Sequence, residues 1–349
     1  MPAPLVLALL LARVPGPPAA AVWRPQASGV AADLRGLAAV SAKIAWATGA
    51  RGTVLRTVDG ETWKPCPVPG AEALDFRDVH ALDARRAWIL AAGVGGAGRI
   101  YRTSDGGATW NLSYTNPEAE GFLDALAFWD ETRGLALGDP VRGRFQVLRT
   151  EDGGTTWTPV PDAGLPSALE NEGAFAASGT CLTTASKEEA WFVTGGGKTS
   201  RVFRTTDGGR TWSVHDTPVP AGAASKGLFT VVVLAPTVVV LGGDYRQPSL
   251  GTLNGAFSDS RGLQWRAAPA EPKGLLSGSC RVPGIHGKGT LTFLAVGLAG
   301  TGLSRDSGRT WHALDTTPLH AVSSAGPGAT WAVGPQGRIL KLEPSALKR

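Results

Sequence analysis

The sequence predicts an all-β fold, a seven-bladed β-propeller whose N-terminal strand completes the last blade. Three observations lead to this prediction: a phrase of about ten residues occurs six times, the copies lie roughly 47 residues apart, and short apolar runs separate them. A period of this size corresponds to one blade of four strands. We therefore expect a single large domain over residues 22–349.

Each copy of the phrase has the pattern of a β-hairpin. The copies are VLRTVDGETW (54–63), IYRTSDGGATW (100–110), VLRTEDGGTTW (147–157), VFRTTDGGRTW (202–212), AFSDSRGLQW (256–265) and GLSRDSGRTW (302–311). A β-branched or aromatic run leads into a turn, and a tryptophan opens the next run. We expect the turn aspartates to accept hydrogen bonds from turn amides and nearby threonine hydroxyls, a structural role. These aspartates are Asp59, Asp105, Asp152, Asp207 and Asp306.

Two further strand-like runs precede each phrase, which gives four strands per unit. The C-terminal part of the chain supplies only three such runs, at 319–324, 329–334 and 338–342. Trp23 occupies the place that the hairpin tryptophan occupies in the other units. We therefore predict that the segment around Trp23 pairs with residues 338–342 and closes the ring, which removes two exposed sheet edges.

The repeated phrase resembles the Asp-box, or BNR repeat, of sialidases, xyloglucanases, sortilin-type receptors and the photosystem II stability/assembly factor family. Four copies fit S/T-x-D-x-G-x-T-W; the first is one residue short, and Ser260 replaces the aspartate in the fifth. The R-T-x-D-G-G-x-T-W form, with Ala-Trp in the preceding strand, is most similar to the assembly-factor family and its relatives in non-photosynthetic bacteria. Those relatives are often labelled oxidoreductase or glycosyl hydrolase. The resemblance implies a propeller that docks other proteins through an arginine-bearing surface.

Signals for catalysis are weak. A sialidase mechanism is disfavoured because the F/Y-R-I-P phrase is missing, whereas a glycosidase with two facing carboxylates stays open. Residues 93–98 match the dinucleotide pattern G-x-G-x-x-G, but a strand follows them in place of a helix N-terminus. Cys66, Cys181 and Cys280 lack metal-ligand spacing, and the five histidines are not paired. We expect no metal site and no cofactor.

The longest connections point to a candidate binding surface. In a blade of strands A to D, the D–A and B–C connections emerge on one face, and the A–B and C–D turns emerge on the other. The long connections are 159–179, before the fourth blade, and 242–255, in the fifth blade; the B–C connection of the third blade adds further charges. The predicted binding residues are Asp139, Arg142, Arg144, Glu170, Asn171, Glu172, Asp244, Tyr245 and Arg246. The alternative interpretation is ordinary solvated loops.

A second feature falls on the same face. Five arginines each stand at the start of a C strand, where a ring of cations would favour an acidic partner: Arg51, Arg99, Arg144, Arg201 and Arg338. The alternative is that these arginines only solvate the strand ends.

The N-terminus resembles an export signal. An apolar run at 5–12 is followed by a Pro/Gly break and three alanines, so we expect residues 1–21 to be a signal peptide and the mature chain to be periplasmic or secreted. This run is too short to span a membrane, and no later segment is long and apolar enough to do so. The chain has a net charge of +5 but no run of five like charges, so nucleic-acid binding is not expected. We expect a monomer.

The leading functional hypothesis is an exported, non-catalytic scaffold that binds a protein partner, in the manner of an assembly or stability factor. The alternative is a carbohydrate-active enzyme or sugar-binding propeller, with a glycan as ligand. An oxidoreductase comes third.

Overall fold

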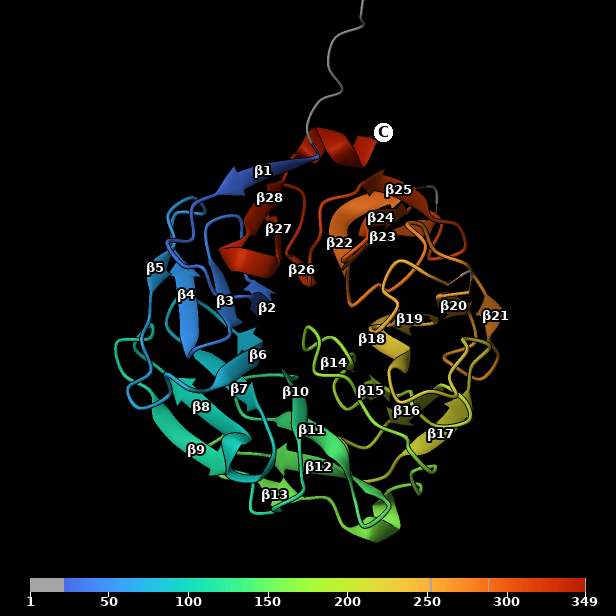
Figure 1. Ribbon diagram of the computed structural model, residues 1–349, viewed down its shortest axis with the longest axis horizontal. Helices are drawn as coiled ribbons and strands as arrows, with labels where there is room; N and C mark the ends of the chain where they lie inside the picture. The colour runs from blue at the N-terminus through green and yellow to red at the C-terminus, as the bar shows by residue number, and fades with distance from the viewer. Residues whose placement is uncertain (1–21, 252, 288, 349) are drawn as a thin grey trace, which may run out of the picture.

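The computed structural model describes residues 22–251, 253–287 and 289–348, and the predicted signal peptide lies outside these residues. In this part of the chain, seven antiparallel sheets of four strands form a ring around a central axis (Figure 1). This arrangement confirms the predicted seven-bladed β-propeller.

Strands follow one another from the axis outwards in each blade. The first three blades consist of β2 (Leu34–Ala39), β3 (Ala45–Gly49), β4 (Thr53–Thr57) and β5 (Lys64–Pro65); β6 (Asp75–Ala81), β7 (Ala87–Ala92), β8 (Arg99–Thr103) and β9 (Asn111–Thr115); and β10 (Leu123–Phe128), β11 (Gly134–Val141), β12 (Arg144–Thr150) and β13 (Thr158–Pro159). The next three consist of β14 (Leu182–Thr184), β15 (Ala190–Val193), β16 (Arg201–Thr205) and β17 (Ser213–Asp216); β18 (Lys226–Leu234), β19 (Thr237–Asp244), β20 (Gly255–Ser258) and β21 (Arg266–Ala267); and β22 (Gly278–Gly287), β23 (Thr290–Gly297), β24 (Gly300–Ser304) and β25 (His312–Asp315).

The seventh blade joins the two ends of the described chain. It contains β26 (Ala321–Ser324), β27 (Thr330–Val333), β28 (Ile339–Leu342) and the N-terminal strand β1 (Trp23–Gln26). Trp23 pairs with Leu342 and Gln26 pairs with Ile339 in an antiparallel register. The predicted closure of the ring is therefore confirmed, and β1 covers the edge of β28 that would otherwise be unpaired.

Short 3-10 turns occur in the connections. They are η1 (Gly95–Ala97), η2 (Asp162–Gly164), η3 (Pro335–Gly337) and η4 (Pro344–Lys348). No helix in the described part of the chain is long and apolar enough to cross a membrane.

The core lies between neighbouring sheets. Trp46, Trp191 and Trp331, each from a B strand, are fully buried. The hairpin tryptophans fill the same inter-sheet space nearer the rim; in the fourth blade, for example, Trp212 packs at 4.9 Å and a tilted angle on Phe192. These large flat side chains bury much apolar area between adjacent sheets, so packing against the neighbouring blades stabilises each blade.

The turn aspartates are bound in nearly the same way in each repeat. Oδ1 of Asp207 accepts bonds from the Thr205 hydroxyl (2.8 Å) and from the Arg210 and Thr211 amides (3.0 and 2.9 Å), and its Oδ2 accepts one from the Thr211 hydroxyl (2.6 Å). The corresponding carboxylates accept bonds from threonine or serine hydroxyls and turn amides around Asp59, Asp105, Asp152 and Asp306. The carboxylate therefore satisfies turn amides that the hairpin leaves without a backbone partner.

Asp207→Ala is expected to lower the free energy of unfolding by about 1–2 kcal/mol, because turn amides lose their acceptor. Partial burial acts to raise the pKa of Asp207, but the hydrogen bonds outweigh it, so the pKa lies below its ordinary value. The difference in free energy of unfolding between the wild type and the variant should therefore reach its full value above about pH 4 and become smaller as the pH falls below that. Urea unfolding between pH 3 and 7 measures this difference. A loss of ligand binding at unchanged stability would contradict a structural role.

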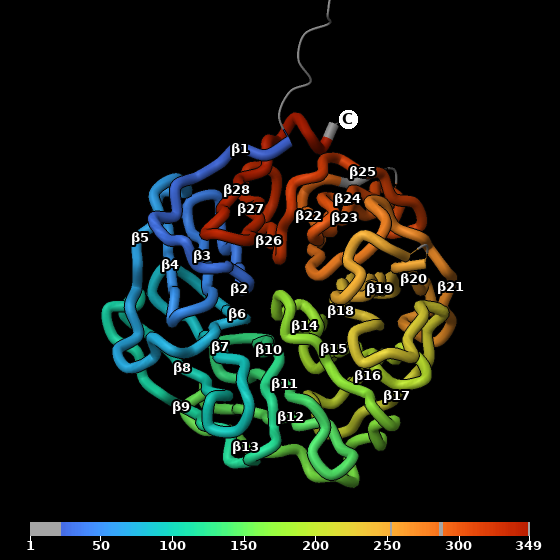
Figure 2. Tube along the Cα trace, in the orientation of Figure 1, coloured from blue at the N-terminus to red at the C-terminus, as the bar shows by residue number. Residues whose placement is uncertain are grey.

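Two faces of the ring differ in their connections. The loop face carries the D–A and B–C connections, and the box face carries the A–B and C–D turns with the Asp-boxes. The central channel is crossed by residues 173–181, which we call the plug segment; it precedes β14 and reaches the middle of the ring (Figure 2). The Ser178 hydroxyl donates to the Ser277 carbonyl in the sixth blade (2.7 Å), and Arg77 of the second blade donates to the Ala176 carbonyl (3.3 Å). The plug segment thus ties opposite sides of the ring together.

Candidate functional site

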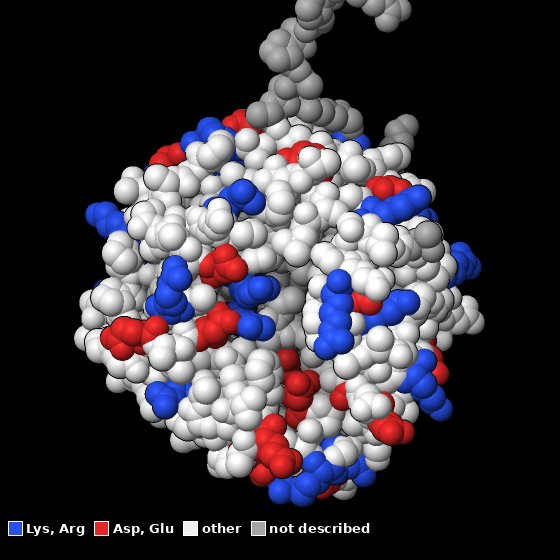
Figure 3. Space-filling view, in the orientation of Figure 1, with Lys and Arg blue, Asp and Glu red and all other residues white. Residues whose placement is uncertain are grey.

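The plug segment separates two cavities along the central channel. The loop-face cavity has a volume of about 770 Å³ and is lined by plug residues 173–177. The box-face cavity has a volume of about 450 Å³ and is lined by Ser178, Gly179 and Thr180. Figure 3 shows a hollow near the centre of the ring with charged side chains of both signs around it. The loop-face cavity is large enough to hold several side chains of a ligand.

Four β-bulges aim side chains into the loop-face cavity. In β2, β6, β10 and β18 the register with the B strand shifts by one residue near the start of the A strand. A bulged residue loses its place in the ladder, and its side chain is redirected. The bulged residues are Arg35, Arg77, Asp124 and Phe229, and all four line the cavity.

The sixth and seventh blades place Ser277 and His320 at the corresponding position, directly before their A strands, and both line the cavity. Six blades therefore each place one side chain in the cavity wall from the start of the A strand. In the fourth blade the plug segment occupies this position. Each of these six residues follows a fully buried apolar residue, which is the sequence signal that would have identified them: Leu34, Phe76, Leu123, Leu228, Leu276 and Leu319. Sequence reasoning missed all six.

Charges are segregated around the cavity. Asp124 and Asp139 lie on the third blade, and Arg35 and Arg77 lie on the first and second blades. Burial and the neighbouring Asp139 carboxylate raise the pKa of Asp124, although Arg77 and the Ala176 amide favour its ionised form. Burial also raises the pKa of Asp139 to about 6, against the effect of a bond from the Ala174 amide.

His320 is the titratable residue of this set that stays uncharged at neutral pH. Burial and the nearby Arg35 lower the pKa of His320 to about 4. Its Nδ1 lies 3.0 Å from the carbonyl oxygen of Leu34, so it also links the seventh blade to the first. At neutral pH the imidazole therefore adds no charge to the cavity.

The opposite wall of the cavity is apolar. Phe175 of the plug segment stacks on Phe229 of the fifth blade, with ring centroids 4.0 Å apart and planes nearly parallel. Tyr245 meets Phe175 edge-on at 6.2 Å, and Leu298 of the sixth blade completes this side. Tyr245 and Leu298 are 47% and 39% exposed, so apolar surface is available to a ligand at the rim.

The predicted binding residues divide into two groups. Asp139, Asn171, Glu172 and Tyr245 line the cavity, whereas Arg142, Arg144, Glu170, Asp244 and Arg246 are not part of its wall. Asp139 lies within β11, where a loop had been expected, because β11 and β12 extend to a tight turn at Arg142 and Gly143. Arg142 is 78% exposed and pairs with Glu118 at 2.8 Å. Glu170 and Arg246 are exposed.

Glu172 is held inside the protein. Its carboxylate accepts bonds from Nε of Arg201 (2.8 Å), from the Thr194 hydroxyl (2.5 Å) and from the Leu169 amide (2.7 Å), and Nη2 of Arg201 also contacts it. Arg201 donates in addition to the Ser167 carbonyl. This buried ion pair fixes the loop that precedes the plug segment.

The arginines at the C strands do not form a continuous exposed ring. Arg201 is buried against Glu172, contrary to the expectation of a cation at the rim. Arg144 and Arg338 donate to the carbonyls of Leu165 and Pro318, and Arg99 donates to the carbonyl of Gly96. Their guanidinium groups therefore bind neighbouring connections, which leaves Arg51 as the one exposed member with no side-chain hydrogen bond or ion pair among the described residues.

Two other candidate sites can be examined directly. The turn at 93–98 contains η1 and leads into strand β8, so no helix N-terminus is available there to bind a phosphate. Among the described residues, no group of three or more His, Cys, Asp or Glu side chains is placed to hold a metal ion.

These features define a seven-bladed β-propeller with a divided central channel and a charged, partly aromatic cavity at its loop face. No protein-family model matches the sequence, and no curated protein matches it.

Solved structures match the chain over most of its length. It is similar to "YCF48 bound to D1 peptide" (15% identity, covering 93% of this chain and 95% of that one, TM-score 0.60) and to "YCF48 from Cyanidioschyzon merolae" (16% identity, 93% and 99%, TM-score 0.61). It is also similar to "Structure of U3-55K" (13% identity, 94% and 100%, TM-score 0.63). At these identities the likeness establishes the fold.

Proposed function

We propose that this protein is an exported, non-catalytic propeller that binds a segment of a partner protein at its loop face and acts as an assembly or stability factor. The observation that carries the proposal is the loop-face cavity, whose rim combines exposed apolar side chains with charges of both signs. A cavity of this kind can receive the side chains of an extended peptide, which a flat surface cannot do. The fold is similar to that of a YCF48 whose structure was solved with a bound D1 peptide, which supports the proposal of peptide binding.

A phage-displayed library of 12-residue peptides tests the proposal. We expect the wild-type protein to enrich binders, and Tyr245→Ala to weaken them at least tenfold because it removes exposed aromatic surface from the cavity rim. Leu263→Ala is the matched control, since Leu263 is 63% exposed in the box-face turn of the same blade. If no binder is enriched, or if both variants behave alike, the proposed function is wrong.

Charges around the cavity should steer the partner. Charge reversal at Arg142 or Arg246, which are exposed beside the cavity on the third and fifth blades, is expected to weaken peptide binding and to flatten its dependence on salt. Fluorescence anisotropy at two salt concentrations measures both effects, with the melting temperature as a control for folding. Unchanged affinity and an unchanged salt slope in both variants would place the binding surface elsewhere.

A carbohydrate-active role is the second candidate, because one observation favours it. Asp124, which is buried, and Asp139, which is half-buried, are neighbouring carboxyls with raised pKa values, opposite an aromatic wall, and such a pair is suited to acid and base roles in glycoside cleavage. Under this hypothesis a screen of aryl glycosides would detect hydrolysis that Asp139→Asn abolishes. Absence of hydrolysis by the wild type leaves peptide binding as the function.

A further inference from the structure

Asp124 is an unusual residue in the wall of the loop-face cavity. It is 1% exposed, it faces the cavity from the bulge in β10, and neither of its carboxylate oxygens accepts a hydrogen bond of good geometry within the described residues. A buried carboxyl without partners is costly to the folded state, so a native protein that keeps one usually has a use for it.

Arg77 favours the ionised form of Asp124 but is shared with other acceptors. Nε of Arg77 bonds to Asp75 at 2.7 Å, and another nitrogen of Arg77 bonds to the Ala176 carbonyl. Asp139 uses Oδ1 for the Ala174 amide, and Glu120 adds a third carboxylate at the rim. Arg35 lies on the first blade, among Arg77, Asp75 and Asp33. The third-blade side of the cavity is therefore an acidic pocket whose neighbouring cation, Arg77, is already bonded to Asp75 and to the Ala176 carbonyl.

From this geometry we infer that the acidic pocket at Asp124 and Asp139 receives a basic side chain, lysine or arginine, from the partner segment. This inference rests on the proposed function and specifies the partner. A cation that enters this pocket favours the ionised form of both carboxyls, and the resulting ion pair is screened by little water.

A side-chain cation fits the cavity better than a metal ion does. A stable metal site needs more ligands than the pair of carboxylates, and no cluster of three or more such groups exists among the described residues. A lysine, by contrast, brings an aliphatic stem that can lie along Ala174 and the Phe175–Phe229 stack while its ammonium group reaches the carboxylates. Tyr245 and Leu298 at the rim would then contact an apolar neighbour of the lysine.

Peptides selected by the wild-type protein provide the probe. We expect them to share a lysine or arginine at one position, and replacement of that residue by norleucine to weaken binding to the wild type at least tenfold. In Asp124→Asn and Asp139→Asn, the affinities for the selected peptide and for its norleucine variant should become nearly equal. The asparagine amide keeps the shape of the aspartate side chain but cannot ionise. Glu170→Gln is the matched control, because Glu170 is an exposed carboxylate that is not part of the cavity wall, and it should retain the preference.

Thermal unfolding separates this role from a structural one. Asp124→Asn should melt at the same temperature as the wild type or higher, because an unpartnered buried carboxyl is removed. Peptides that bind without any preference for a basic residue, or a preference that both aspartate variants retain, overturn the inference and leave the proposed function intact. If the wild-type protein enriches no peptides, both fail.

Discussion

Glu172→Ala is expected to lower the free energy of unfolding by about 3–5 kcal/mol, the largest effect among the substitutions considered. The side chains of Glu172 and Arg201 are 0% and 8% exposed, so the variant leaves a guanidinium buried without its counter-ion. The Thr194 hydroxyl and the Leu169 amide lose an acceptor at the same time. Equilibrium unfolding in urea measures the loss.

Two comparisons show whether the buried pair is responsible. A double variant, Glu172→Met with Arg201→Met, should be more stable than Glu172→Ala, because it leaves no uncompensated charge. Glu118→Ala, which breaks the exposed pair with Arg142, should cost less than about 1 kcal/mol. If Glu172→Ala costs no more than Glu118→Ala, the ion pair does not hold the loop.

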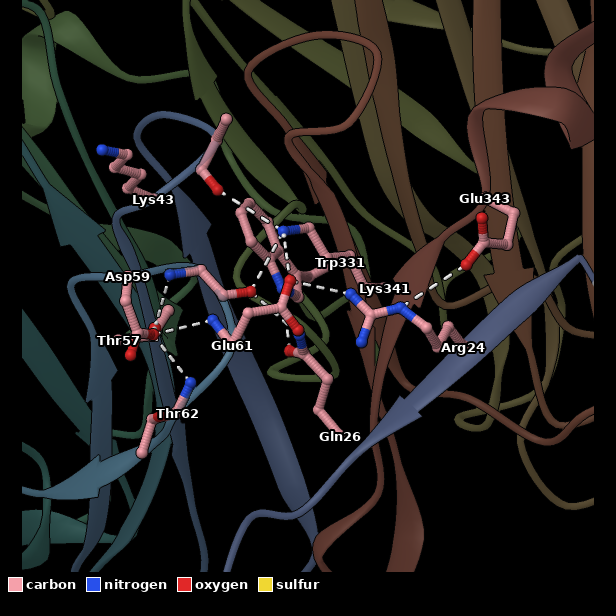
Figure 4. Close-up of polar contacts among 12 residues, drawn as sticks. Arg24, Gln26, Lys43, Thr57, Asp59, Glu61, Thr62, Trp331, Lys341 and Glu343 are labelled. Atoms are coloured by element: carbon pink, nitrogen blue, oxygen red, sulfur yellow. Dashed lines mark hydrogen bonds and ion pairs between the residues drawn. The ribbon is translucent and has the colours of Figure 1, made fainter.

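Gln26→Ala is expected to cost about 2–4 kcal/mol through the closure of the ring. Oε1 of Gln26 accepts bonds from the indole nitrogens of Trp63 (2.8 Å) and Trp331 (3.1 Å), and its Nε2 donates to Gly60 and Glu61. Figure 4 shows this side chain on β1 between Trp331 and the turn that contains Glu61. The alanine variant leaves two buried indole N–H groups without an acceptor.

Conservative variants at the same seam provide the controls. Gln26→Met keeps most of the side-chain volume but offers no strong acceptor to the indoles, so it should lose nearly as much stability as Gln26→Ala. Arg24→Ala breaks an ion pair whose side chains are 45% and 51% exposed, and it should cost less than about 1 kcal/mol. The prediction is wrong if Gln26→Ala and Arg24→Ala are equally mild in urea unfolding.

Repeat spacing carried the fold prediction, because five of the six hairpins place the turn and the tryptophan at the same offset and the first differs by one residue. The same periodicity located Trp23 as the missing strand, and the register of β1 with β28 confirms it. Both inferences depend on local pattern and on counting. They need no knowledge of contacts between distant residues.

The cavity was harder to predict for a physical reason. A bulge shifts one residue from the ladder into the channel, and apart from the apolar residue that precedes it, the alternation around Asp124 does not distinguish it from a solvent-facing aspartate. The plug segment is fixed by contacts such as Ser178 with Ser277, which lie 99 positions apart. Glu172 and Arg201 were each singled out, but their pairing across 29 positions was not visible in the sequence.

Closure by the N-terminal strand has a consequence for the order of folding. The hydrogen bond between Trp331 and Gln26 joins residues 305 positions apart, whereas the hairpins within each blade close over short loops. Contacts of such high sequence separation form last, because loop-closure entropy opposes them until most of the chain is ordered. While the chain is being synthesised, β1 therefore waits without its partner until residues 339–342 emerge, and β1 and any already formed sheet edge are open during that interval to pairing with another copy.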